Sequence, residues 1–191
     1  MGELVLIRHG QTEWSAAGRH TSRTDLPLTP EGEQQAVALR GALAGAAFAA
    51  VLCSPRRRSL RTAELAGLAV TAIDEDLVEW DYGDYEGLTS AQIREYRPDW
   101  SLWRDGCPGG ESPEQVGARL DRLLARAGEL AAGGDVVLIG HGHSLRVAAA
   151  RWAGFAPSAG AALFLGTATV SRLGHEHSNQ VIREWNAPVT A

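Results

Sequence analysis

Short apolar runs alternate with longer, helix-like segments along most of the chain. The runs are only four or so residues long and are rich in Val, Leu and Ile, which is typical of buried strands. Towards the end of the chain the pattern changes to an apolar and polar alternation, which indicates strands with one exposed face. We therefore predict strands at residues 4–7, 51–52, 70–73, 136–139, 169–173 and 180–183.

The segments between these runs carry helix-start signals. Ser or Thr precedes Pro at three of the starts, and at two of the starts Gln stands three residues after Ser or Thr, as in a capping box. The expected helices begin at Thr29, Ser54, Thr89, Ser112 and about Ser144. The first is expected to run to about residue 46, and the fourth is long, with an apolar stripe on one face.

Strands that alternate with helices predict an α/β fold. The expected architecture is a three-layer sandwich, in which a mostly parallel central sheet is flanked by helices on both faces. The length of 191 residues suits one domain over residues 1–191.

Composition narrows the class of protein. Apolar residues make up 45% of the chain and charged residues 21%, which excludes a disordered chain. A net charge of −5 argues against nucleic acid or an anionic membrane as a partner. No apolar run reaches the roughly 20 residues that cross a bilayer, and the 2 cysteines give no disulfide framework. We expect a cytoplasmic protein. The sequence does not decide between a monomer and a homo-oligomer.

Ionisable residues follow the predicted strands at the points where the strands end. Arg8 and His9 follow the first strand, an arginine run at 56–58 follows the second, Glu79 follows the third, and His141 follows the fourth. Because the carboxyl ends of parallel strands share one edge of a sheet, we expect these side chains to converge there.

This combination of side chains suits phosphoryl transfer. Arginine binds phosphate through two hydrogen bonds, a histidine can attack phosphorus, and a carboxyl group can protonate the leaving oxygen. Arginine and histidine supply the positive charge, so no metal or cofactor is expected. The expected partner is a small phosphorylated metabolite, and the expected intermediate is a phosphohistidine.

The motifs resemble those of the histidine phosphatases, the phosphoglycerate-mutase-like superfamily, over nearly the whole chain. They lie at residues 6–14, which include Arg-His-Gly, at 54–63, which begin with Ser-Pro-Arg-Arg-Arg, at 79–87, at 110–112 and at 137–142, which end with Gly-His-Gly. The resemblance implies that His9 is the nucleophile and Glu79 the general acid and base. It also implies that Arg8, Arg58 and His141 bind the phosphate.

A narrower resemblance is to the sedoheptulose-1,7-bisphosphatase branch and its actinobacterial acid-phosphatase relatives. It rests on the segments at 18–21, 82–87, 103–107 and 141–146. This likeness implies substrate-binding roles for His20, Thr21, Tyr82 and Arg146. Many members of the superfamily have Asn where Ser15 stands, which is a departure in this chain.

Several alternatives remain at this stage. The same core residues serve a cofactor-dependent phosphoglycerate mutase, a broad-specificity acid phosphatase or a non-catalytic member of the fold. The pairs His141/His143 and His175/His177 have the spacing of metal ligands, although a third ligand is missing, and His177 is also a candidate for the pocket wall. Asp81 is the reserve choice for the acid.

Overall fold

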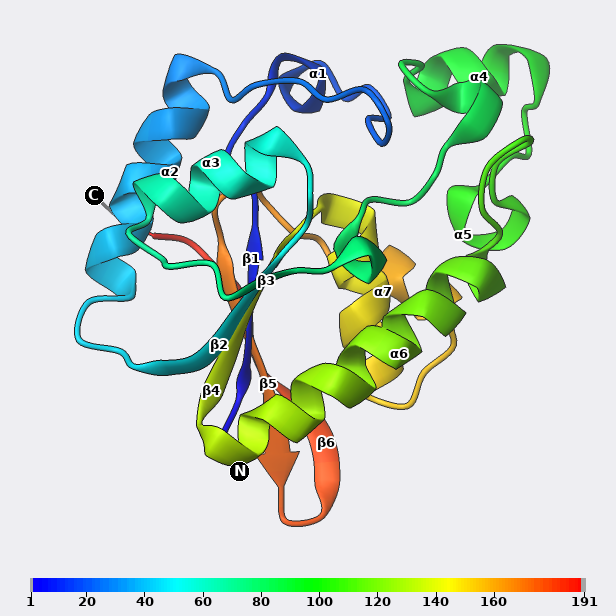
Figure 1. The fold of residues 1–191 in the computed structure, drawn as a ribbon. Coiled ribbons are helices and arrows are strands. Elements are labelled where there is room, and N and C mark those ends of the chain that lie inside the picture. The colour runs from blue at the N-terminus through cyan, green and yellow to red at the C-terminus, as the bar shows by residue number, and fades with distance from the viewer. Residues whose placement is uncertain (1, 190–191) are drawn as a thin grey trace.

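One mixed sheet runs through residues 2–189, the part of the chain that the computed structural model describes (Figure 1). Its strand order is β3-β2-β4-β1-β5-β6. The strands are β1 (Leu4–Arg8), β2 (Phe48–Cys53), β3 (Ala72–Ile73), β4 (Asp135–Gly140), β5 (Val170–Glu176) and β6 (Asn179–Ala187).

The first four strands in chain order are parallel, as the sequence predicts. β1 and β2 both pair with β4, and β3 pairs with β2. β5 runs antiparallel to β1, and β6 runs antiparallel to β5. The predicted mostly parallel sheet is therefore confirmed, with an antiparallel hairpin at one edge.

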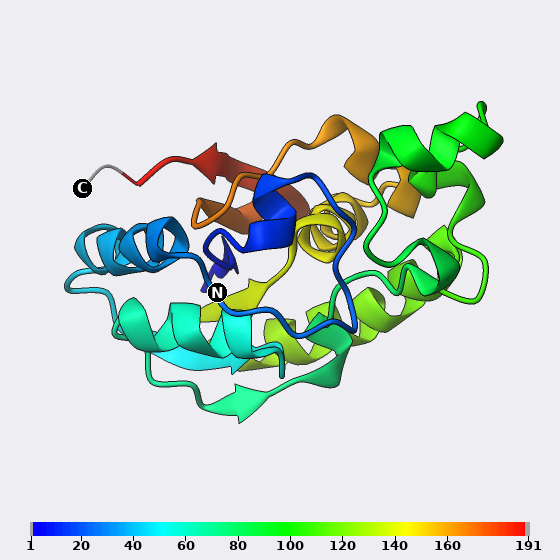
Figure 2. The ribbon, with the colours of Figure 1, turned by 90° about the horizontal axis from the view of Figure 1, so that it is seen from above.

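Helices cover both faces of the sheet, which Figure 2 shows from above. The α-helices are α1 (Glu13–Ala16), α2 (Pro30–Ala42), α3 (Arg57–Leu65), α4 (Ser90–Tyr96), α5 (Leu102–Asp105), α6 (Pro113–Leu130) and α7 (Gly142–Trp152). Short 3₁₀ helices are η1 (Glu75–Leu77), η2 (Gly83–Tyr85), η3 (Ala131–Gly133) and η4 (Pro157–Ala162). Within the described residues, we find no helix that combines the length and the apolar character needed to span a membrane.

Alternate residues of the central strands pack into two separate cores. Val5 and Ile7 of β1 join a cluster with Leu39 of α2. Leu4 and Leu6 of the same strand join the larger cluster with residues of α6 and α7. Because successive side chains of a strand point to opposite faces, this division places α2 and α3 on one face and α6 and α7 on the other. The predicted three-layer sandwich is confirmed.

Some element boundaries differ from the predicted ones. α2 ends at Ala42 rather than near residue 46, and Gly45 beyond it adopts a positive φ of 76° that ends the regular backbone. α7 begins at Gly142, slightly earlier than expected. The capping boxes at Thr89 and Ser112 are present as predicted.

Ser54 does not begin a helix, so that expectation is wrong. Its backbone N–H donates to Ile139 O at 2.9 Å and continues the β2–β4 ladder. α3 begins later, with Arg56 as its N-cap. The Ser54 hydroxyl is hydrogen-bonded to the His141 ring instead of capping a helix.

Two glycines let the segment after β1 cross the first turn of α2. A Cβ atom on Gly10 would lie 2.3 Å from Gly32 O, and one on Gly32 would lie 2.1 Å from Gln11 O. Real Cβ atoms do not approach backbone oxygen so closely, so the crossing requires glycine at both positions. This crossing fixes the backbone next to His9.

We expect Gly32→Ala to lower the free energy of unfolding by about 1–3 kcal/mol, because the added methyl group has to displace backbone. Gly41→Ala in the same helix is the control. Its new methyl group meets nothing within 4 Å, so the usual stabilisation of about 0.5–1 kcal/mol is expected there. Urea unfolding measures both variants, and a Gly32→Ala protein as stable as the original would contradict the close crossing.

Candidate active site

The carboxyl ends of the parallel strands carry the candidate residues. Arg8 is the last residue of β1, and His9 follows it. The His9 backbone N–H donates to Gly140 O at 3.0 Å, which holds the end of β1 against the end of β4. Ser54 follows β2, and His141 follows β4 and precedes α7. The sheet therefore brings these residues to one edge, as the topology rule predicts.

His9 is held with one ring nitrogen free to react. Nδ1 of His9 lies 2.7 Å from Gly10 O. Because a carbonyl oxygen can only accept, Nδ1 carries the proton and Nε2 keeps its lone pair. The His9 residue is only 5% exposed, and it lines the cavity described below. The tautomer with its proton on Nδ1 and its lone pair on Nε2 is the one that a nucleophilic imidazole needs.

Burial also keeps His9 uncharged. Desolvation lowers the pKa of His9 well below its usual value, and the positive charges of Arg58 and Arg8 lower it further. A protonated imidazole has no lone pair to donate, so this environment preserves the nucleophilic form into mildly acidic solution.

The Arg8 guanidinium keeps donors available at the cavity wall. Its Nη1 donates to Leu165 O, and its Nε is buried without a partner among residues 2–189. Burial lowers the pKa of Arg8, so its positive charge is poorly solvated. A Cβ on Gly142 would lie 3.3 Å from Arg8 Cζ, so the turn into α7 approaches the guanidinium closely. An anion in the cavity would supply the missing acceptors.

Arg58 and His141 adjoin His9 but do not belong to the cavity lining. Arg58 is fully buried, and its Nε donates to His141 Nδ1 at 3.2 Å. The other guanidinium nitrogens donate to backbone carbonyl oxygens of Thr21, Ser22 and Thr24. Arg58 therefore holds the loop that follows α1.

The His141 ring is engaged at both nitrogens. Nδ1 accepts from Arg58, so Nε2 carries the proton and donates to Ser54 Oγ at 2.8 Å. The His141 and His9 ring centroids are 5.1 Å apart. The structure thus brings the predicted phosphate ligands together, but the donors of Arg58 and His141 are bound to protein groups in this state.

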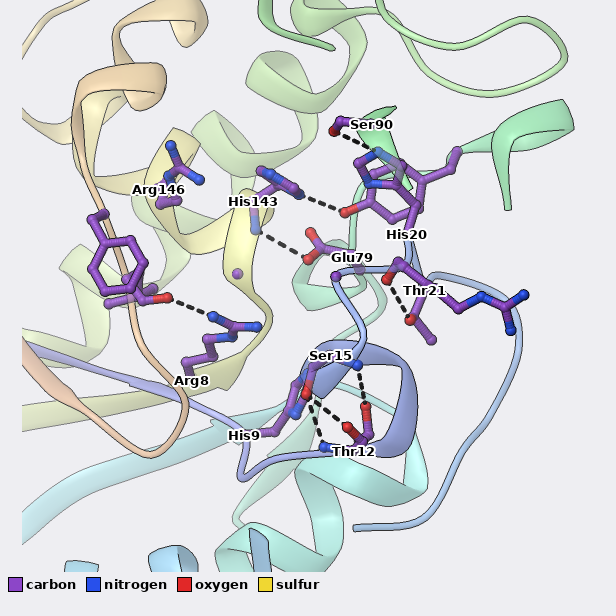
Figure 3. Close-up of a pocket in the computed structure, with 16 residues that line it drawn as sticks. Arg8, His9, Thr12, Ser15, His20, Thr21, Glu79, Ser90, His143 and Arg146 are labelled. Atoms are coloured by element: carbon purple, nitrogen blue, oxygen red, sulfur yellow. Dashed lines mark hydrogen bonds between the residues drawn. The ribbon is translucent and has the colours of Figure 1, made fainter. Parts of the chain in front are cut away.

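The Glu79 carboxylate caps the N-terminus of α7 (Figure 3). Oε1 accepts from Ser144 N at 2.8 Å and from Trp80 N at 2.8 Å, and Oε2 accepts from His143 N at 3.0 Å. Glu79 lines the cavity and is 5% exposed. These hydrogen bonds fix the position of the carboxyl group beside the cavity.

Arg119 positions Glu79 and was missed by the sequence analysis. This α6 residue donates from Nη2 to Glu79 O at 3.2 Å and from Nη1 to Val78 O at 2.9 Å. It also forms an ion pair with Glu111 at 2.8 Å. The available signal was an arginine next to Leu120, within the apolar stripe of the long helix. An arginine there must find buried partners.

A cavity of about 230 Å³ opens beside these groups. Its lining consists of Arg8, His9, Thr12, Ser15, Gly18, Arg19, His20, Thr21, Glu79, Tyr82, Ser90, Gly142, His143, Arg146, Phe164 and Leu165 (Figure 3). Three arginines and one carboxylate are among these lining residues. The excess of positive charge suits an anionic ligand.

The residues implied by the narrower resemblance lie around the same cavity. His20, Thr21, Tyr82 and Arg146 all line it. His20 Nε2 lies 3.3 Å from Ser90 Oγ, and its ring packs on Tyr82 with centroids 4.6 Å apart. Phe164, 72% exposed, belongs to a rim segment for which the sequence made no prediction.

Arg146 stands at the cavity without a carboxylate partner among the described residues. Its Nε donates to Gly160 O at 2.9 Å and its Nη2 to Ala161 O at 3.0 Å. The guanidinium carbon lies 4.5 Å from the centroid of the Trp103 ring. Arg146 is therefore oriented by carbonyl oxygens and an aromatic ring, and its charge is not neutralised.

Other candidates lie elsewhere or serve the backbone. Asp81 pairs with Arg23 and is not part of the cavity lining. His175 and His177 lie at the β5–β6 hairpin beside a separate hollow, so the expectation that His177 lines the pocket is wrong. Within residues 2–189, no three His, Cys, Asp or Glu side chains gather in a metal-binding arrangement.

Comparisons with protein families, curated proteins and solved structures all identify similarity to histidine phosphatases. Residues 4–188 match the family model of the histidine phosphatase superfamily, branch 1. The chain is 47% identical to an acid phosphatase of Mycobacterium tuberculosis, over 91% of this chain and 87% of that protein. It is 37% identical to sedoheptulose 1,7-bisphosphatase of Saccharomyces cerevisiae, over 78% and 67% respectively. A solved Mycobacterium tuberculosis structure, 42% identical, superposes with a TM-score of 0.96 and covers 99% of each chain.

The buried imidazoles make stability depend on pH. Burial lowers the pKa of His9, His20, His141 and His143, that of His20 to about 4. In the unfolded chain these histidines bind protons below about pH 6.5. In the folded protein their lowered pKa values keep them neutral at the same pH. The free energy of unfolding should therefore fall as the pH drops below about 6.5, by up to about 1.4 kcal/mol per histidine and pH unit.

Urea unfolding at pH 7.5 and 5.5, in variants of His20, tests whether the buried histidines cause this pH dependence. We expect His20→Gln to reduce the difference between the two pH values by about 1 kcal/mol, because one of the buried groups is removed. His177→Asn is the control, since His177 is an exposed residue with a positive φ that Asn tolerates. Equal pH differences in His20→Gln and the original protein would contradict the assignment.

Proposed function

The chain belongs to the histidine phosphatase superfamily and is a phosphoric monoester hydrolase, and from this premise we propose that it releases phosphate from small phosphorylated metabolites through phospho-His9. The observation that carries the proposal is the His9 ring, whose Nδ1 proton is held by Gly10 O while Nε2 stays free beside the cavity. We expect the reaction to proceed without a metal ion, because the arginines that line the cavity supply positive charge for the phosphoryl group.

The proposed reaction has two steps. His9 Nε2 donates its lone pair to phosphorus, the bond from phosphorus to the ester oxygen breaks, and Glu79 gives its proton to that oxygen. A water molecule then attacks the phosphohistidine and returns a proton to Glu79. Inorganic phosphate leaves, and neutral His9 is restored. Because burial holds the pKa of His9 low, the imidazole stays neutral and nucleophilic for the first step even in mildly acidic solution.

Positive charge stabilises the phosphoryl group in this scheme. Arg8 lines the cavity, and its Nε has no hydrogen-bond partner among the described residues. Arg58 and His141 join the phosphate if their present hydrogen bonds to the loop carbonyls and to Ser54 are exchanged for bonds to phosphate oxygens.

The preferred substrates in this proposal are sugar phosphates, and a second anionic group favours binding. Arg146 supports this because its charge has no carboxylate partner and it lies at the cavity. The similarity to a sedoheptulose 1,7-bisphosphatase supports the same class, whereas the similarity to an acid phosphatase supports a broader range of monoesters. A cytoplasmic location and a homo-oligomer remain predictions from the sequence.

The role of Glu79 predicts a dependence on the leaving group. Glu79→Gln should lower kcat on alkyl phosphates by roughly a hundredfold or more, because a poor leaving group needs the proton. On p-nitrophenyl phosphate, whose leaving group is stable as an anion, the loss should stay below about tenfold. Asp81→Asn is the control for a nearby carboxylate outside the cavity lining. Equal losses of Glu79→Gln on both substrates would indicate a structural role only.

The position of the Arg146 guanidinium at the cavity predicts that the enzyme prefers bisphosphates to monophosphates. We expect kcat/KM for a sugar bisphosphate to exceed that for its monophosphate by about ten- to a hundredfold, and Arg146→Met to remove this preference. Arg151→Met is the matched control, because Arg151 lies on the same helix and pairs with Asp121 away from the cavity. No preference in the original protein, or an equal loss on both substrates, would favour the broad-specificity acid phosphatase.

A further inference from the structure

His143 occupies a position that connects the general acid to the far half of the cavity. It is near the start of α7, and its backbone N–H donates to Glu79 Oε2 at 3.0 Å. Its side chain lines the cavity together with His20, Ser90 and Tyr82. The reaction proposed above gives the imidazole of His143 no task. Because its backbone is bound to the proton donor of that reaction, the His143 side chain is a candidate contact for the leaving group.

Tyr82 fixes the tautomer of this imidazole. The Tyr82 hydroxyl lies 2.6 Å from His143 Nδ1, and no other partner of the hydroxyl occurs among residues 2–189. Burial raises the pKa of Tyr82 well above its usual value, so the phenol keeps its proton and donates it. Nδ1 of His143 is thus the acceptor, and the ring proton resides on Nε2. The Nε2–H group has no protein partner among the described residues.

Aromatic neighbours fix the orientation of the His143 ring. Trp103 packs edge to face against it, with centroids 5.3 Å apart, and Tyr82 does so at 5.9 Å. The His20 ring lies 5.9 Å away on a further side. A ring held in this way loses little entropy when it binds a ligand, so its hydrogen bond is selective.

The ring is neutral as well as fixed. Burial lowers the pKa of His143 well below its usual value, and the positive charges of Arg146 and Arg8 lower it further. His20 and Ser90 nearby are also uncharged donors or acceptors at neutral pH. A neutral N–H matches a hydroxyl oxygen better than a phosphate, for which the arginines are present.

We propose that His143 is a specificity-determining residue whose Nε2–H donates to a hydroxyl oxygen of the leaving group, so that the enzyme favours polyol and sugar phosphates over plain alkyl phosphates. This inference rests on the proposed function, since it assigns the leaving group of that reaction. The same residue holds Glu79 with its backbone and the leaving group with its side chain. Binding of the hydroxyl therefore aligns the ester oxygen with the proton donor.

A comparison of paired substrates and variants tests the proposal. Glycerol 3-phosphate and n-propyl phosphate share the three-carbon chain and the ester but differ in hydroxyl groups. We expect the original protein to prefer glycerol 3-phosphate by about tenfold in kcat/KM. His143→Phe keeps a ring but has no donor, and should reduce the preference to about one. His143→Gln carries an N–H near the position of Nε2, and should keep part of it.

Tyr82→Phe tests whether the hydroxyl group of Tyr82 contributes to the preference by fixing the tautomer of His143. It removes the hydroxyl that fixes the tautomer but leaves His143 in place, so the preference should fall to an intermediate value. His175→Phe is the matched control, because this histidine packs on Trp152 away from the cavity and its replacement should leave the preference unchanged. The ratio of two substrates is compared within each variant, so a general loss of active protein cancels.

The outcomes distinguish this inference from the proposed function. Hydrolysis of both substrates with the same ratio in the original protein and in His143→Phe would overturn the inference and leave the phosphatase reaction intact. Release of phosphate from neither substrate by the original protein would overturn the proposed function, and the inference with it. A ratio that falls in His143→Phe and is partly kept in His143→Gln supports the inference.

Discussion

Positive charge buried next to a neutral imidazole is the condition on which the rest of this site depends. Arg8 and Arg58 adjoin His9, and together with desolvation they hold its pKa low. Backbone carbonyl oxygens, rather than closely paired carboxylates, accept most of their hydrogen bonds. The cationic edge therefore remains largely unneutralised until an anion enters. The glycine crossing at Gly10 and the loop held by Arg58 keep this costly arrangement in place.

The one carboxylate in the cavity lining is constrained from two sides. The N-terminus of α7 donates to the side chain of Glu79, and Arg119 of α6 donates to its backbone carbonyl. α6 and α7 pack together on the same face of the sheet, so the position of the Glu79 carboxyl group depends on that helical layer. His9 instead depends on β1 and on the crossing with α2. The cavity lies where these two supports meet, which explains why residues far apart in sequence line one cavity.

Local signals in the sequence were sufficient to locate the edge but not to orient its side chains. Apolar runs that end at Arg8, Ser54 and His141 indicated a common edge because parallel strands align their carboxyl ends. The orientation of Arg58 was not accessible, since its donors go to the backbone of a loop whose path depends on tertiary packing. Arg119 was missed for a related reason. Its partners are carbonyl oxygens, which leave no mark in a sequence.

Two further differences have physical causes of the same kind. Ser54 has the sequence of a helix cap, but the β2–β4 ladder continues through it and directs its hydroxyl to His141. His143 was considered only as half of a metal pair because of its spacing from His141. In the structure the His141 ring is hydrogen-bonded to Ser54 and the His143 ring to Tyr82. The spacing of the two histidines therefore does not indicate a pair of metal ligands.

Trapping of the phosphoenzyme tests the central claim most directly. The enzyme, treated with EDTA, is mixed with a sugar phosphate labelled in its phosphoryl group and quenched in alkali within milliseconds, and the labelled peptide is mapped. The account predicts an acid-labile phosphate on His9 that transfers to water, and none in His9→Ala. Label on another residue, a requirement for added metal, or no covalent label while phosphate is released would contradict it. Transfer to 3-phosphoglycerate in preference to water would instead support a mutase.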